Sequence, residues 1–223
     1  MSRWLAAIAL ALVAACGGAP VGASLPAQVP PRIPSTRVTQ DSTSAALVPA
    51  GFGTLKQEDI AITLQPNGVR VTAIPLDESV IRVLAPDAYR SLHSILESKR
   101  QQILQRAASH NTRDPRVWYV TFTGLVPDAR FVPTDITVTS GGRDYRPLDV
   151  IGLSSGFAEQ RLQPRSTEKG LLIFDEGLDV SQPVVVSIGS ERNIDWSNDR
   201  SDSILSKIES ERAQVRARAG GRP

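Results

Sequence analysis

A group of carboxylates and one glycine-flanked serine have the residue types and spacing most typical of catalysis. Asp175, Glu176 and Asp179 are close in sequence, and paired carboxylates can hydrolyse glycosides or bind calcium. Residues 152–156 have the Gly-x-Ser-x-Gly spacing of a serine nucleophile elbow. That elbow requires a strand running directly into a helix in an α/β sheet, whereas Pro164 and antiparallel strands surround this segment. We therefore interpret the carboxylates as a charged turn and the serine segment as a loop.

Two histidines are present, and neither has metal-ligand spacing. We expect His93 to be a packed or half-exposed helix residue and His110 to lie at the end of the same helix. A protonated imidazole is favourable there because it faces the last carbonyl groups. No HExxH motif and no glycine-rich phosphate loop occur. The sequence thus predicts no metal, no cofactor and no enzymatic activity.

Cys16 is the only cysteine, and it ends a short apolar run. Arg3 supplies one positive charge, and Trp4–Val13 is shorter than the roughly 20 apolar residues that span a bilayer. This organisation is typical of a secretory signal peptide. The motif Val13-Ala14-Ala15-Cys16 resembles the lipobox of bacterial lipoproteins.

The lipobox resemblance implies that the signal is cut before Cys16 and that the cysteine is acylated on its sulfur and its amine. Several acyl chains anchor a protein stably, whereas one holds only marginally. The implied membrane partner is lipid, and the implied location is the cell envelope. Gly17 after the cysteine, rather than Asp, favours the outer membrane. Ordinary cleavage near Ala15, with an incidental cysteine, remains the alternative.

The charge of the chain is close to neutral. The formal net charge of +2 decreases by one when Arg3 leaves with the signal. The chain therefore has no excess of positive charge of the kind that binds nucleic acid. Four arginines cluster near the C-terminus: Arg212, Arg216, Arg218 and Arg222. We interpret them as a solvated helix face that continues into a tail.

Composition divides the chain into four parts. We expect a signal peptide at 1–15, the lipidated cysteine with a disordered Pro/Ala/Ser-rich tether at 16–50, one domain at 51–216, and a disordered basic tail at 217–223. With no cysteine beyond Cys16, the domain cannot contain a disulfide.

Hydrophobic periodicity predicts mostly strands within the domain. A hairpin is expected at 59–65 and 69–74, around the turn Pro66-Asn67-Gly68. The further expected strands lie at 118–123, 131–139, 145–150, 171–174 and 184–188. A short helix or turn is expected around 76–84, a long helix at about 86–108 and a C-terminal helix at about 200–216.

Consecutive strands without intervening helices favour antiparallel pairing. The predicted fold is mainly β, an antiparallel immunoglobulin-like β-sandwich with one long inserted helix and a C-terminal helix. A partly open barrel is the alternative. The segments 118–122, 131–136, 170–174 and 184–188 resemble an uncharacterised family of extracytoplasmic bacterial domains with a telokin-like fold. The resemblance implies the fold and an envelope location, and it carries no catalytic residues.

The aromatic and basic residues suggest where a partner could bind. Trp118 shares a strand face with Val120 and Phe122 and is expected in the core. Trp196 is expected to pack the last helix against the sandwich. The candidate partner surface consists of two tyrosines expected to be exposed and two arginines of the long helix: Tyr119, Tyr145, Arg100 and Arg106.

These patterns predict a membrane-anchored envelope lipoprotein whose non-catalytic sandwich binds or supports another envelope protein. The alternative is a carbohydrate- or peptidoglycan-binding module, because sugar faces stack on exposed aromatic rings. A hydrolase that uses the carboxylates is the third hypothesis.

Overall fold

The computed structural model describes residues 49, 51–196 and 202–220. The signal peptide, Cys16 and nearly all of the tether lie outside the described residues, so their assignments stay predictions.

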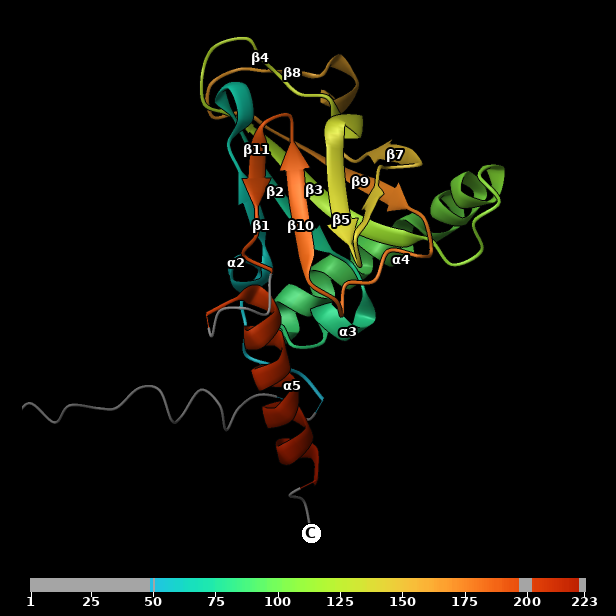
Figure 1. The fold of residues 1–223 in the computed structure, drawn as a ribbon, viewed down its shortest axis with the longest axis vertical. Coiled ribbons are helices and arrows are strands. Elements are labelled where there is room, and N and C mark those ends of the chain that lie inside the picture. The colour runs from blue at the N-terminus through green and yellow to red at the C-terminus, as the bar shows by residue number, and fades with distance from the viewer. Residues whose placement is uncertain (1–48, 50, 197–201, 221–223) are drawn as a thin grey trace, which may run out of the picture. The chain divides into compact units, whose positions relative to one another are not determined.

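Two antiparallel sheets form the body of the domain (Figure 1). One has the strand order β1-β2-β3-β9-β7, the other has the order β11-β10-β5-β6, and β4 and β8 form a separate two-stranded ribbon. The strands are β1 (Ile62–Leu64), β2 (Val69–Pro75), β3 (Arg116–Gly124), β4 (Ala129–Arg130), β5 (Ile136–Ser140), β6 (Arg143–Tyr145), β7 (Asp149–Gly152), β8 (Arg161–Leu162), β9 (Thr167–Phe174), β10 (Val184–Ile188) and β11 (Glu191–Asn193).

Four α-helices and three short 3-10 helices accompany these strands in the described part of the chain. They are α2 (Gln57–Ile60), α3 (Glu78–Ile81), α4 (Pro86–Ser109), α5 (Ile204–Gly220), η1 (Pro66–Gly68), η2 (Pro133–Asp135) and η3 (Phe157–Glu159). The mainly β antiparallel class, the long inserted helix and the C-terminal helix are therefore confirmed.

The two sheets approach each other at β1 and β11 without joining. Asn193 Nδ2 donates to the Thr63 carbonyl oxygen at 3.0 Å, but the described residues include no ladder between these two strands. The chain passes between the sheets from β3 to β5, from β6 to β7 and from β9 to β10. The arrangement is thus a sandwich rather than a partly open barrel.

The inner face of β3 forms the centre of the core. Trp118, Val120 and Phe122 are buried, as their alternation predicts. Phe122 stacks on Phe131 with ring centroids 4.2 Å apart, and Phe157 meets both rings edge-on. Offset and edge-to-face packing of this kind stabilises a core beyond simple area burial.

Helix α4 covers one part of the other face of the five-stranded sheet, where Tyr119 and Leu171 are buried. Arg106 of the helix lies 3.1 Å from Asp149 of β7, and α4 buries Leu92, Ile103 and Ala107 on one side. Leu171 of β9 is fully buried on the covered face. Where both faces are covered, consecutive residues are buried, as at Val117–Val120 of β3 and Gly170–Phe174 of β9, whereas Thr167–Lys169 at the other end of β9 are exposed or half-buried.

The predicted element boundaries fail mainly at prolines. The expected strand 131–139 begins only at Ile136, because Pro133 starts the turn η2. The expected strand 145–150 is divided at Pro147 into β6 and β7, which belong to different sheets. Proline cannot donate to a ladder and often ends a strand.

The C-terminal helix begins later and ends later than predicted. It runs from Ile204 to Gly220 and so includes part of the segment predicted as a disordered tail. Glu211 is buried on it and accepts hydrogen bonds from the Thr54 amide at 2.9 Å and from Arg218 Nη2 at 2.6 Å. This carboxylate fastens α5 to the first described residues of the domain.

Candidate functional site

The serine of the Gly-x-Ser-x-Gly segment has a structural role. Ser154 lies in the turn between β7 and η3, donates a short hydrogen bond to Glu168, and accepts the Lys169 amide at 2.9 Å. Its hydroxyl therefore ties the turn to β9. The strand does not run into a helix of the length that a nucleophile elbow requires, because η3 spans only Phe157–Glu159.

The carboxylates after β9 cap turns. Asp175 Oδ1 accepts the Gly177 amide at 2.9 Å, and Asp179 Oδ1 accepts the Ser181 amide at 2.8 Å and its hydroxyl at 2.7 Å. Both are Asx turns, in which the side chain bonds the backbone two residues on. The Ser181 hydrogen bonds lower the pKa of Asp179, and Arg116 lowers it further. Both side chains therefore stabilise the loop that follows β9.

The expected exposure of the two candidate tyrosines is wrong. Tyr119 is 9% exposed, because α4 covers the outer face of β3, and burial raises its pKa. Tyr145 is 8% exposed and donates from its hydroxyl to the Gly177 carbonyl at 2.8 Å. Arg106 is paired with Asp149, and Arg100 lies 3.3 Å from Glu97. The four residues do not form one surface, since two of them are interior.

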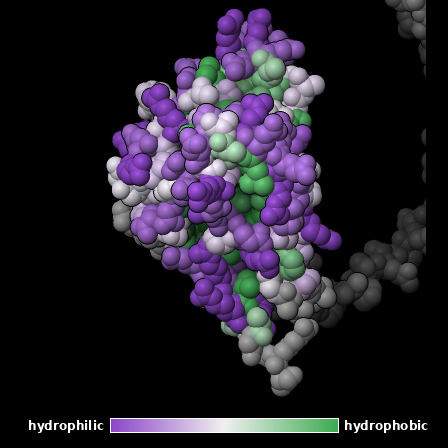
Figure 2. Space-filling view, turned by 90° about the vertical axis from the view of Figure 1, so that its right-hand side faces the viewer, coloured by the Kyte–Doolittle hydropathy of each residue, from purple (hydrophilic) through white to green (hydrophobic). Residues whose placement is uncertain are grey.

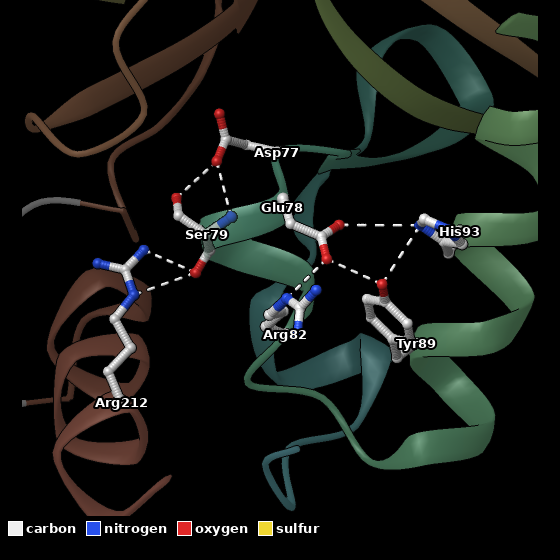
Figure 3. Close-up of polar contacts among 7 residues, drawn as sticks. All are labelled: Asp77, Glu78, Ser79, Arg82, Tyr89, His93 and Arg212. Atoms are coloured by element: carbon white, nitrogen blue, oxygen red, sulfur yellow. Dashed lines mark hydrogen bonds and ion pairs between the residues drawn. The ribbon is translucent and has the colours of Figure 1, made fainter. Parts of the chain in front are cut away.

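A polar cluster instead gathers around α3, which lies between α4 and α5 (Figure 3). Glu78 Oε1 accepts from Arg82 Nε at 2.7 Å and from the Tyr89 hydroxyl at 2.8 Å. His93 Nδ1 lies 3.8 Å from the other oxygen of Glu78, and its ring stacks on Tyr89. From the opposite side, Arg212 donates two hydrogen bonds to the Ser79 carbonyl oxygen.

The start of α3 is held by Asp77. Its Oδ1 accepts from the Ser79 amide at 2.9 Å and from the Ser79 hydroxyl at 2.6 Å, which is the geometry of an N-cap. Its Oδ2 lies 3.4 Å from Arg116 Nη1 of β3, and Arg116 Nη2 lies 3.3 Å from Asp114. A single guanidinium thus bridges the helix start and the loop before β3.

Acid–base chemistry at Tyr89 is unfavourable. Burial raises the pKa of Tyr89, and the hydrogen bond to Glu78 raises it further. A catalytic base or nucleophile needs a pKa shifted toward neutrality. The phenol therefore stays protonated and acts as a hydrogen-bond donor that positions Glu78.

Beside this cluster is a cleft of about 260 Å³, which we call the α3 cleft. Its polar lining consists of Asp77, Glu78, Asp114 and Arg116, and its apolar lining includes Leu76, Leu96, Val117 and Trp118. Arg116 Nε and Trp118 Nε1 are buried and have no hydrogen-bond partner among the described residues. Leaving a buried donor unpaired costs about 1–3 kcal/mol. Both nitrogens are therefore unpaired donors enclosed in the packed interior beside the cleft.

The second buried tryptophan shows the contrast. Trp196 is also fully buried, but its Nε1 donates to the Val180 carbonyl oxygen at 3.1 Å. Val180 itself lines the α3 cleft. The unpaired state of Trp118 is therefore not a general property of buried indoles in this fold.

The two histidines lie in different settings. His93 joins the cluster around Glu78. His110 is the exposed C-cap residue of α4, where its backbone amide bonds the Ala107 carbonyl oxygen. Among the described residues, no three His, Cys, Asp or Glu side chains are grouped closely enough to hold a metal ion. The described helices also include none that is long and apolar enough to cross a membrane.

Comparisons with known proteins do not assign the chain to a family. No family model, curated protein or solved structure matches this chain.

Sequence reasoning missed the α3 cleft because its residues come from separate elements. Asp77 caps the start of α3, Leu96 belongs to α4 and Arg116 to β3. The one local signal was Pro75-Leu76-Asp77-Glu78 before a short apolar run, which is typical of a helix start.

Proposed function

We propose that this protein is a lipid-anchored envelope protein whose sandwich domain binds another envelope protein and catalyses no reaction. The lipobox resemblance supports the anchor. The α3 cleft supports the binding role. Its lining of both charged and apolar side chains, with the exposed Asp114 at its edge, is the observation that carries the proposal.

The side chains with catalytic potential are occupied in structural contacts. Ser154 is bonded to Glu168 and Lys169, Asp175 and Asp179 cap turns, and the Tyr89 phenol is held protonated. This favours a binding role over the carboxylate-dependent hydrolase.

The carbohydrate alternative loses its main support. It rested on exposed aromatic rings, but Trp118, Trp196, Tyr119 and Tyr145 are all buried. A stacking platform requires an accessible ring face.

The surface also favours a small polar contact over a broad apolar one. Figure 2 shows one side of the molecule, on which hydrophobic residues form only a narrow, broken band. Specific interfaces do not need to be more apolar than the rest of a protein surface.

Site-specific photo-crosslinking in whole cells tests the proposal. A crosslinking amino acid replaces Asp114, which is 74% exposed at the edge of the α3 cleft. We expect a crosslinked product that contains one reproducible envelope protein. The matched control is the same replacement at Asp144, an exposed aspartate in β6.

Two results would contradict the proposal. One is the absence of any product from position 114. The other is an identical set of products from positions 114 and 144, because random collision would then explain both.

A further inference from the structure

Strand β7 forms one edge of the five-stranded sheet, and its only ladder among the described residues is the one to β9. Sheet edges are usually protected by charged side chains, proline or a covering segment. The edge strands β6 and β11 each carry two charged residues, and Asn193 bonds the β1 edge at Thr63. In β7 only Asp149 is charged, and the strand continues as Val150-Ile151-Gly152. This edge is therefore the least protected of the four.

The backbone groups on the outer side of β7 belong to Val150 and Gly152. Residue pairs across an antiparallel ladder alternate between bonded and non-bonded pairs. The Leu153 amide donates to the Lys169 carbonyl oxygen at 2.8 Å, in the register of the ladder between β7 and β9. Leu153 and Ile151 are therefore turned toward β9, whereas Val150 and Gly152 are turned away from it.

Most of these outward groups are open. The Val150 amide donates to Asp149 Oδ1 at 2.7 Å. The Val150 carbonyl group and both backbone groups of Gly152 have no hydrogen-bond partner among the described residues. Gly152 is exposed, and because glycine has no side chain, this exposure is that of its backbone. An open amide beside open carbonyl groups at a sheet edge is complementary to a second extended main chain.

A cavity of about 560 Å³, which we call the β7 groove, lies beside this edge. Its lining includes Val150 and Gly152, together with Pro133 of η2 and Phe157 of η3. A Cβ built on Gly152 would lie 3.1 Å from the Phe157 ring, so this ring is next to the glycine. The groove shares no lining residue with the α3 cleft. It therefore brings open backbone groups and an apolar wall together at a second site.

We infer that the β7 groove binds an extended, uncharged segment of a partner protein, which adds to the five-stranded sheet as a further strand. This inference goes beyond the proposed function, because it concerns a different site. The segment runs antiparallel to β7, as the neighbouring strands of both sheets do. Its residue opposite Gly152 exchanges two hydrogen bonds with the glycine, and the side chain of that residue lies on the face of Phe157.

The lining of the β7 groove favours an uncharged segment. Its one charged side chain is Asp149, which lies 3.1 Å from Arg106 and accepts the Val150 amide. The other polar lining residues are neutral: Thr134, Ser154, Ser155 and Gln160. A charged segment would thus find no unpaired opposite charge, whereas apolar side chains at alternate positions would contact the apolar wall.

A separate segment fits the groove better than a second copy of this chain. Strand β7 has four residues, and η2 and η3 contribute to the lining beside it. Two copies that paired edge to edge would bring both sets of flanking segments together. A single extended chain carries no such flanking segments.

Amide exchange with a short peptide tests the inference. The probe is acetyl-Thr-Val-Thr-Val-Thr-amide, in which the valines share one face of a strand. It is titrated into the ¹⁵N-labelled full chain in detergent, and exchange of backbone amides with water is followed by NMR. At about ten times the Kd, the Gly152 amide should exchange about tenfold more slowly, because only the free form is open. The control is Gly141, an exposed glycine in the turn between β5 and β6, whose exchange rate should not change.

Two N-methylated peptides identify the edge that forms the hydrogen bonds. In the proposed alignment a valine lies opposite Gly152, so the valine amides face β7 and the threonine amides face away. Methylation of both valine amides should abolish binding. Methylation of the second and third threonine amides adds the same number of methyl groups and should leave binding in place.

A matched pair of variants gives the corresponding measurement in the protein. Gly152→Ala and Gly152→Pro both add a Cβ beside Phe157, but only proline removes the outward amide. Proline is accepted in an edge strand where its nitrogen faces outward. Gly152→Pro should bind the probe about fivefold more weakly than Gly152→Ala, the loss expected for one hydrogen bond. The peptide comparison uses the native chain, so it decides the inference even if neither variant folds.

Three results would overturn the inference. One is an unchanged exchange rate of the Gly152 amide with the unmodified peptide, and another is equal binding of the two methylated peptides. The third is slow exchange of Gly152 without peptide that becomes faster on dilution, because a second copy would then occupy the edge. Crosslinking at position 114 reports on the α3 cleft, so the proposed function is tested separately.

Discussion

Individual side chains show how the surroundings decide what a residue can do. Glu78 is the acceptor for Arg82 and for the Tyr89 hydroxyl, so its carboxylate is held in place by two neighbouring side chains. Ser154 is likewise bonded to the backbone of β9 at Lys169, and Asp179 to the backbone of its own loop. Arg116 and Trp118 differ, because each keeps a buried donor without a partner. These two nitrogens are enclosed in the packed interior beside the α3 cleft.

The raised pKa of Tyr89 predicts a loss of stability in alkaline solution. Its folded pKa lies above the ordinary value of 10.0, so the stabilisation is complete below that pH and is lost as pH rises through the folded pKa. The free energy of unfolding should fall above pH ~10, and Tyr89→Phe should make this fall shallower. Urea unfolding on both sides of that pH measures it. Burial also raises the pKa of Tyr119, so the variant should retain part of the decrease in unfolding free energy. The same pH dependence in the variant and the native protein would contradict the assignment to Tyr89.

Helix α4 shows how one element changes the role of another. Its buried residues cover the outer face of β3 and bury Tyr119, which alternation alone places outside. The same helix supplies Tyr89 and His93 to the cluster and Leu96 to the cleft. It therefore completes the core and builds one wall of the site.

Two leucines of α4 test this packing. Leu92 is 1% exposed and Leu104 is 47% exposed. Leu92→Ala should lower the free energy of unfolding by about 2–5 kcal/mol, because it leaves a cavity. Leu104→Ala, the control on the same helix, should change it by about 0.5 kcal/mol or less. Similar losses for the two variants would show that α4 is not packed as described.

The molecule as a whole combines a sandwich, an inserted helix and a proposed lipid anchor. Glu211 connects the end of the chain to Thr54 at the beginning of the domain, so both ends of the domain are held together. The anchor itself depends on Cys16, the only cysteine.

Replacing Cys16 tests the anchor. Cys16→Ser should abolish labelling with a fatty-acid analogue and move the protein from the membrane fraction to the soluble fraction, because the acyl chains supply the membrane affinity. Gly18→Ser, two residues away, is the control and should stay labelled. Mass spectrometry showing an unmodified or uncleaved N-terminus in the native protein would contradict the lipoprotein assignment.

Local patterns were sufficient to predict the class of the fold. Alternating segments and turn residues specify the strands, a helical stripe specifies α4, and Trp118 is correctly assigned to the core. These features are encoded within short stretches, so sequence alone reveals them. The α3 cleft and the burial of Tyr119 and Tyr145 could not be predicted. They depend on which distant segments pack together, and periodicity shows that a face is apolar without showing whether a second element covers the opposite one.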